Sequence, residues 1–213
     1  MRRTVWILAL AAGYVDGLAL LYLGGVFASV VTGNLLLVGI TAATDPHHLT
    51  GTAARAALAV AVYTITVALA RNLPPARCLV AGLAALCTLT GAWAAVHHDP
   101  HGTAQLPLLV LAVIAAALQA AAQRDGDPPT GYLTGPLIRV AEGRIHLAGD
   151  GAPLIAMPLG AAGAALLLDK IPWLGPLPAV ALVAAAVVLR AIPPRKTRTR
   201  AGATPRPEPA RTP

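Results

Sequence analysis

The chain has 213 residues, of which 56% are hydrophobic and 12% are charged, and its mean hydropathy is +0.67. A soluble domain carries about 25% charged residues, so half that share excludes a water-soluble enzyme or nucleic-acid-binding module. The formal net charge of +7 does not indicate a nucleic-acid partner, because residues 190–213 alone hold seven Arg or Lys and one Glu. The basic character belongs to the C-terminal end of the chain.

Six apolar stretches are long enough to cross a bilayer as helices, since a hydrocarbon core of about 30 Å needs about 20 apolar residues. Clusters of Pro, Gly, Asp and His separate these stretches and predict turns. The predicted spans are 5–23, 53–70, 78–96, 104–122, 153–168 and 174–192. They predict one integral membrane domain over 1–192, followed by a disordered, basic, Pro-rich cytoplasmic tail over 193–213.

Two further apolar segments, 26–42 and 130–141, either cross the membrane or form re-entrant segments. If both crossed, the bundle would have eight spans. The positive-inside rule favours six, because six spans place Arg71 and Arg77 on the same side as the N-terminus and the basic tail. The sequence therefore predicts an all-α, polytopic bundle of six transmembrane helices with both termini in the cytoplasm.

The two halves of the chain carry matching polar features. Each half has one polar residue inside a predicted span and a Thr-Gly step 15 or 16 residues later. These residues are Asp16 and Thr32-Gly33 in the first half, and Gln119 and Thr134-Gly135 in the second. Because each half holds three spans, an odd number, the second half would cross the membrane in the inverted sense. This predicts two inverted three-helix repeats, over about 5–96 and 104–192, each with a broken segment at its Thr-Gly step.

Inverted repeats with broken segments at matching positions are typical of transporters with a site near the membrane midplane. An acid inside a span, such as Asp16, costs about 2.5–3.5 kcal/mol on insertion scales, so it is a candidate proton relay or cation ligand. The alternative is a structural lock, in which neighbouring donors hold the carboxyl group. At each break, Thr is expected to cap a half-helix and Gly to permit a turn or a close approach. The predicted substrate- or ion-binding residues are Asp16, Thr32, Gly33, Asn34, Gln119, Thr130, Thr134 and Gly135.

Several of these motifs together resemble the YoaK family of bacterial multi-pass membrane proteins. They are Gly13-x-x-Asp16, Val26-Phe27 and Thr32-Gly33-Asn34-Leu35, with a second signature in Gln119 and Thr130-x-x-x-Thr134-Gly135. The likeness covers about residues 9–192 and implies a compact bundle in the bacterial inner membrane. It implies no substrate. Pro136 stands where the first repeat has Asn34, which removes one polar side chain from the second site.

No pairing of nucleophile and base, no zinc-protease motif and no phosphate-binding loop occurs in the sequence, so neither an enzyme nor a bound metal or cofactor is predicted. The outer loops hold five histidines beside two aspartates. We expect these residues to be solvated, with a surface metal or pH-sensing cluster as the alternative. They are His47, His48, His97, His98 and His101, with Asp45 and Asp99.

The leading interpretation is a small inverted-repeat transporter or permease for a small solute or ion, coupled to protons through Asp16. The alternative is a non-transporting membrane scaffold or accessory subunit, whose halves would pack along a dry seam of small residues. The expected partners are the lipid bilayer and the solute or ion, and a homo-oligomer remains open.

Overall fold

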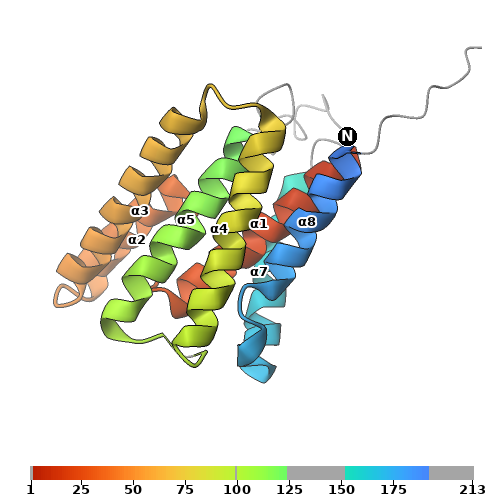
Figure 1. Ribbon diagram of the computed structural model, residues 1–213. Coiled ribbons are helices and arrows are strands. Elements are labelled where there is room, and N and C mark those ends of the chain that lie inside the picture. The colour runs from red at the N-terminus through yellow and green to blue at the C-terminus, as the bar shows by residue number, and fades with distance from the viewer. Residues whose placement is uncertain (1, 99, 124–151, 192–213) are drawn as a thin grey trace, which may run out of the picture.

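The computed structural model describes residues 2–98, 100–123 and 152–191, and the regular structure of these residues is entirely helical. The all-α class is therefore confirmed. In these described residues, seven α-helices and two short 3₁₀ helices form one bundle (Figure 1). They are α1 (Arg2–Tyr22), α2 (Val31–Thr44), α3 (Leu49–Ala70), α4 (Pro75–Ala95), η1 (Gly102–Ala104), α5 (Gln105–Ala121), α7 (Ala152–Lys170), η2 (Pro172–Leu174) and α8 (Leu177–Ala191).

Within the described residues, four helical stretches are long and apolar enough to cross a membrane. They are Thr4–Tyr22, Leu49–Ala70, Pro75–Ala95 and Gly102–Ala121. These stretches coincide with the first four predicted spans, which confirms a multi-pass membrane protein by length and composition. The last two predicted spans, 153–168 and 174–192, fall on α7 and α8.

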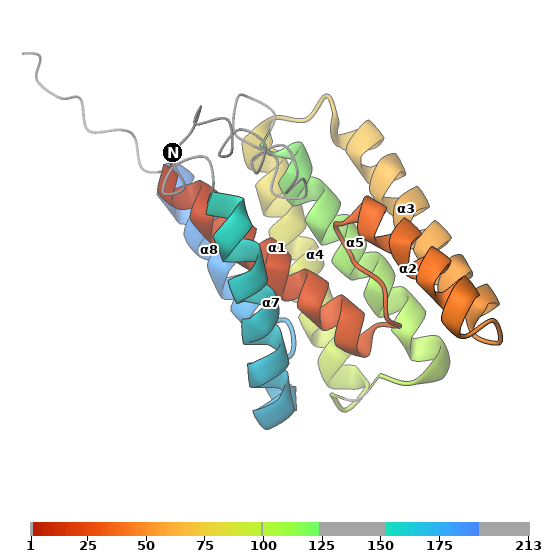
Figure 2. The same ribbon diagram turned by 180° about the vertical axis from the view of Figure 1, so that it is seen from behind.

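Helix α1 lies at the centre of the bundle, where it packs against α7, α8 and α5. Helix α5 in turn packs against α3 and α4, and α4 also contacts α8. Figures 1 and 2 show that the start of α1, the α3–α4 turn, the end of α5 and the end of α8 lie together at one end of the bundle. We call this the N-terminal end. The opposite end holds the end of α1, the α2–α3 turn, the α4–α5 connection and the α7–α8 turn.

Segment 23–30 and helix α2 together form a loop into the bundle that starts and finishes at this opposite end. After α1, residues 23–30 turn back along the bundle, α2 begins partway up, and it returns to the end where α3 starts (Figure 2). Gly24 and Gly25 make the reversal with φ angles of 108° and 75°, which other residues rarely adopt. With 14 residues, α2 is about 21 Å long, too short to cross a hydrocarbon core. The other ambiguous segment, 130–141, lies outside the described residues.

The contact between α1 and α7 is a seam of glycines. A Cβ atom on Gly13 would lie 2.1 Å from the carbonyl oxygen of Met157, and one on Gly160 would lie 2.1 Å from that of Leu10. No side chain fits at such distances, so the backbones of the two helices touch directly. Small residues allow this close packing in membranes, where burial of apolar side chains gives little driving force between helices.

Candidate functional site

Asp16 connects α1 to the non-helical segment 23–30. Its side chain is 3% exposed. The backbone N–H of Ser29 donates to Oδ1 of Asp16 at 2.7 Å, and the Ser29 hydroxyl donates to Oδ2 at 2.5 Å. Both carboxylate oxygens are therefore bound by a single residue of segment 23–30. This geometry lets an acid be buried inside an apolar bundle, since buried polar groups are stable when they are hydrogen-bonded.

Asn34 fixes the same segment to the first turn of α2. The backbone N–H of Phe27 donates to Oδ1 of Asn34 at 2.7 Å, and Nδ2 of Asn34 donates to the carbonyl oxygen of Phe27 at 2.9 Å. The amide side chain thus satisfies both backbone groups of one residue in a stretch that has no helical or sheet partner. Asn34 is 2% exposed, so this paired contact is shielded from solvent.

Gly33 provides space for the ring of Phe27, because a Cβ atom on Gly33 would lie 2.8 Å from Cδ2 of that ring. Thr32 does not occupy the N-cap position predicted for it. Val30 occupies the N-cap position of α2, no side chain caps the helix, and Thr32 is exposed on its second residue. The expectation that Thr32 caps the half-helix is wrong, because Asn34 holds the incoming chain and the helix begins upstream of the threonine.

Gln119 lies on α5 with its side chain 1% exposed, and neither Oε1 nor Nε2 has a hydrogen-bond partner among the described residues. Gly82 of α4 lies across from it, where a Cβ atom would be in ordinary van der Waals contact with Gln119, 3.9 Å from its Cγ. Gln119 is two residues before the end of α5, at the N-terminal end of the bundle. Asp16 is six residues before the end of α1, towards the opposite end.

The structure therefore joins Asp16, Gly33 and Asn34 through residues 27–29 and leaves Gln119 apart from them. The predicted site residues Thr130, Thr134 and Gly135 lie outside the described residues.

Sequence reasoning missed the two residues that Asp16 and Asn34 bind. Ser29 has a visible signal, because it is the only hydroxyl residue between Tyr22 and Thr32 and follows the pair Gly24-Gly25. Phe27 contributes backbone groups as well as its ring, and backbone contacts leave no trace in residue type.

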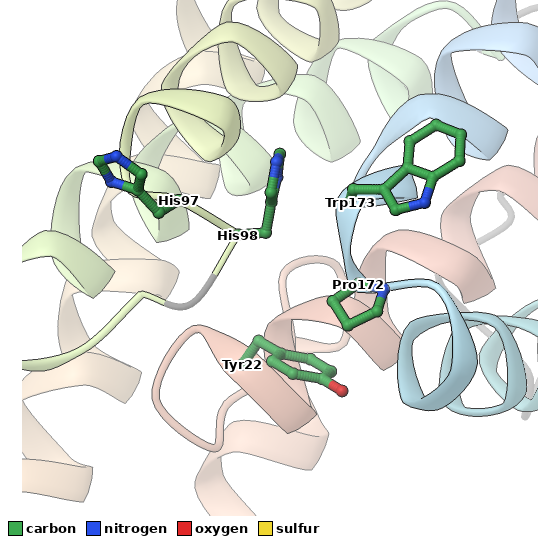
Figure 3. Close-up of a pocket in the computed structure, with 5 residues that line it drawn as sticks. All are labelled: Tyr22, His97, His98, Pro172 and Trp173. Atoms are coloured by element: carbon green, nitrogen blue, oxygen red, sulfur yellow. The ribbon is translucent and has the colours of Figure 1, made fainter.

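The histidines of the opposite end separate into two groups. His48 Nδ1 lies 2.7 Å from Oδ2 of Asp45 on the exposed α2–α3 turn. His97 and His98 instead line a pocket of about 520 Å³ together with Tyr22, Pro172 and Trp173 (Figure 3). The part of the chain that the structure describes has no group of three or more His, Cys, Asp or Glu residues placed to hold a metal ion.

A family model described as "Protein of unknown function (DUF1275)" matches residues 4–189. The chain belongs to this family. DUF1275 corresponds to the YoaK-like membrane proteins, so the resemblance carried by the Asp16 and Thr32-Gly33-Asn34 motifs is confirmed. Comparison with curated proteins and with solved structures gives no match. The match to DUF1275 covers all or nearly all of each described helix, and it includes segment 23–30 with both of its anchoring side chains.

Proposed function

We propose that this DUF1275 chain is a small transporter of the inverted-repeat type, which moves a small solute or ion across the bacterial cytoplasmic membrane. Segment 23–30 with α2 is the observation that carries the proposal, because it is non-helical backbone inside an apolar bundle. Such backbone is tolerated at membrane depth where protein buries it or where it lines a water-filled cavity. Broken helices of this kind are the usual elements of transporter sites.

The positions of the two buried polar residues support inverted repeats. Asp16 lies 14 residues after the start of α1 at Arg2, and Gln119 lies 14 residues after the start of α5 at Gln105. The two helices run in opposite directions along the bundle (Figure 1). Equal distances from the starts of antiparallel helices are the relation that a two-fold axis in the membrane plane would produce.

The packing of the helices supports the same relation. In two inverted repeats, α1 would correspond to α5, α3 to α7 and α4 to α8. The contact between α1 and α7 would then correspond to that between α5 and α3, and the contact between α1 and α8 to that between α5 and α4. The α1–α5 and α4–α8 contacts map onto themselves. All of these contacts occur, and this is the pattern expected of two equivalent sets of three helices.

The distribution of charge supports six crossings with cytoplasmic termini. Arg71 and Arg77 lie at the α3–α4 turn and Arg190 lies near the end of α8, all at the N-terminal end of the bundle. At the opposite end, Lys170 is paired with Asp169 at 2.7 Å. Because Arg and Lys are more frequent on the cytoplasmic side of membrane proteins, these three Arg favour the N-terminal end as the cytoplasmic one.

In the proposed mechanism, the contact between Asp16 and Ser29 controls the movement of segment 23–30. The carboxylate accepts two hydrogen bonds from Ser29. Protonation places a hydrogen on one carboxyl oxygen and weakens its acceptance of a donor, so the segment is released when Asp16 takes up a proton. The carboxamide of Gln119, which has no partner within residues 2–98, 100–123 and 152–191, offers one donor group and one acceptor to a passing solute at the other end of the bundle.

Proteoliposomes containing the full chain and an internal pH-sensitive dye test this proposal. Gradients of small cations, anions, amino acids, sugars and amines should reveal at least one solute that moves with protons. Asp16→Asn keeps the shape of the side chain but cannot titrate, so it should abolish the proton signal, and Ser29→Ala should reduce coupling. Thr88→Ala is the matched control, because its hydroxyl bonds only the carbonyl of Ala84 in its own helix. Wild-type flux that persists unchanged in Asp16→Asn would overturn the coupling role.

One observation favours the second candidate, a scaffold or accessory subunit that transports nothing. The seam of Gly13 and Gly160 brings backbones into direct contact and leaves no space between α1 and α7. A protein whose halves cannot separate along this seam would be a rigid membrane anchor for other subunits. Absence of flux for every class of solute in the wild-type protein would replace the transport proposal with this one.

A further inference from the structure

Three connections meet at the opposite end of the bundle and line an open pocket of about 520 Å³ (Figure 3). Tyr22 comes from the end of α1, His97 and His98 follow α4, and Pro172 and Trp173 belong to η2. Small-molecule sites commonly have volumes of about 300–1,000 Å³ and form where separate elements converge. The pocket has the size and origin of such a site, and none of the predicted site residues lines it.

Hydrogen bonds between helices fix the walls of this pocket without any ligand. Nε1 of Trp93 donates to the carbonyl oxygen of Pro172 at 3.0 Å, and Nε2 of Gln105 donates to that of Tyr22 at 3.1 Å. The hydroxyl of Tyr14 donates to the carbonyl oxygen of Gly175 at 2.8 Å. Each bond joins two different elements, so the cavity is preformed, which lowers the entropic cost of binding.

The two histidines are held by an uncommon backbone conformation. His97 and His98 have φ angles of 55° and 66°, in the left-handed region that side chains other than glycine visit rarely. The backbone N–H of His98 donates to the carbonyl oxygen of Trp93 at 3.2 Å and helps to hold this conformation. Strained backbone persists where the surrounding structure enforces it, and such residues cluster at ligand sites.

The side chains that line the pocket indicate the charge of its ligand. Aromatic rings attract cations through their electron-rich faces, and Tyr22 and Trp173 supply two such rings. No Arg or Lys is among the described lining residues, and Lys170 nearby is already paired with Asp169. An anion would therefore find no permanent positive charge. We infer that the pocket binds a small organic cation, such as an alkylated ammonium ion, with its alkyl groups against the rings and Pro172.

This inference is independent of transport, because the pocket involves neither segment 23–30 nor Gln119. The cation binds at the surface of the bundle opposite the Arg-rich end. Binding is an equilibrium property, so failure to detect flux in proteoliposomes leaves this site unaffected, and failure to bind leaves the transport proposal unaffected.

Choline and its uncharged isostere 3,3-dimethylbutan-1-ol test the inference, since they differ in shape very little and in charge by one unit. Saturation-transfer NMR titrations on the full chain in lipid nanodiscs, at constant ionic strength, should give a dissociation constant for choline at least about fivefold lower than that for the alcohol. Trp173→Leu keeps an apolar wall but removes the ring, and it should weaken choline binding by about fivefold or more.

Trp6→Leu is the matched control, because Trp6 lies near the start of α1 at the N-terminal end and does not line the pocket. It should leave choline binding unchanged. Tyr22→Leu supplies a second ring deletion in case Trp173→Leu alters the fold, which size-exclusion elution would reveal. Equal affinity for choline and the alcohol would show an apolar pocket without charge selectivity. Equal choline affinity in both ring variants, or no saturable choline binding to the wild type, would overturn the proposal.

Discussion

Asp16 in the first half of the bundle and Gln119 in the second lie equally far from the starts of two antiparallel helices, yet their environments differ. Asp16 is bonded through both oxygens to Ser29, whereas both polar atoms of the Gln119 side chain lack partners in the part of the chain that the structure describes. Each side chain is at most 3% exposed. Equal burial therefore has opposite energetic consequences at the two positions.

The difference shows what a buried polar group does in an apolar bundle. At Asp16, it stabilises a stretch of non-helical backbone that would otherwise carry unsatisfied groups. At Gln119, the carboxamide is removed from water without compensation, which costs about 1–3 kcal/mol. The first half is stabilised by its polar residue, and the second half tolerates one.

Among the variants that test this comparison, Asp16→Ala should have the largest effect on the free energy of unfolding. It leaves the buried N–H and hydroxyl of Ser29 without acceptors, and bonds to a charged group contribute about 1.5–3 kcal/mol each. We expect the free energy of unfolding, measured by SDS titration in mixed micelles, to fall by about 3–5 kcal/mol. Asp16→Asn should recover part of this loss, because its carbonyl oxygen still accepts from the Ser29 amide. A loss below about 1 kcal/mol in Asp16→Ala would contradict a stabilising role for the contact.

Asn34→Ala should have the next largest effect. It removes the paired contact to both backbone groups of Phe27 and leaves them buried in an irregular segment. Two neutral hydrogen bonds contribute about 0.5–1.5 kcal/mol each, so we expect a loss of about 2 kcal/mol in the same titration. Faster hydrogen exchange at Phe27 than in the helices should accompany this loss, and unchanged exchange would argue against the contact.

Gln119→Met should change stability in the other direction. Methionine has nearly the same shape and no groups that need hydrogen bonds, so the variant should be more stable than the wild type by about 1 kcal/mol. Leu118→Met on the same helix turn serves as a control for the introduced side chain. Destabilisation by Gln119→Met would mean that the carboxamide has a partner in the folded protein and that the two halves are alike.

Thr32→Ala should have the smallest effect. The side chain is exposed and caps nothing, so the change in stability should stay within about 0.5 kcal/mol. Thr32 is two residues from Asn34 in the Thr-Gly-Asn motif. Comparing the two alanine variants therefore distinguishes the residue that stabilises the fold from the residue that is available for another role. Proteoliposome flux that changes in Thr32→Ala at constant stability would assign such a role to its hydroxyl.

Much of the helical framework follows from the sequence, because a membrane-spanning helix requires a continuous stretch of apolar residues. The predicted span at 5–23 becomes α1, and that at 78–96 becomes α4, each with ends shifted by a few residues. Asp16 and Asn34 are also recognisable, since a polar side chain is costly inside an apolar stretch. Their partners are harder to recognise, because Phe27 contributes only its backbone N–H and carbonyl to Asn34, and Ser29 contributes its backbone N–H as well as its hydroxyl to Asp16.

The sequence by itself determined that the chain is a multi-pass membrane protein whose helices follow from continuous apolar stretches. It also marked Asp16 and Asn34 as unusual polar positions. Only the tertiary structure decided that α2 turns back, that α1 touches α7 through Gly13 and Gly160, and that Gln119 lies away from Asp16. Hydropathy records how much a segment avoids water, and this is a property of neighbouring residues. Contacts between backbone segments that are distant in sequence depend on how closely their helices pack, and this packing is set only when the bundle folds.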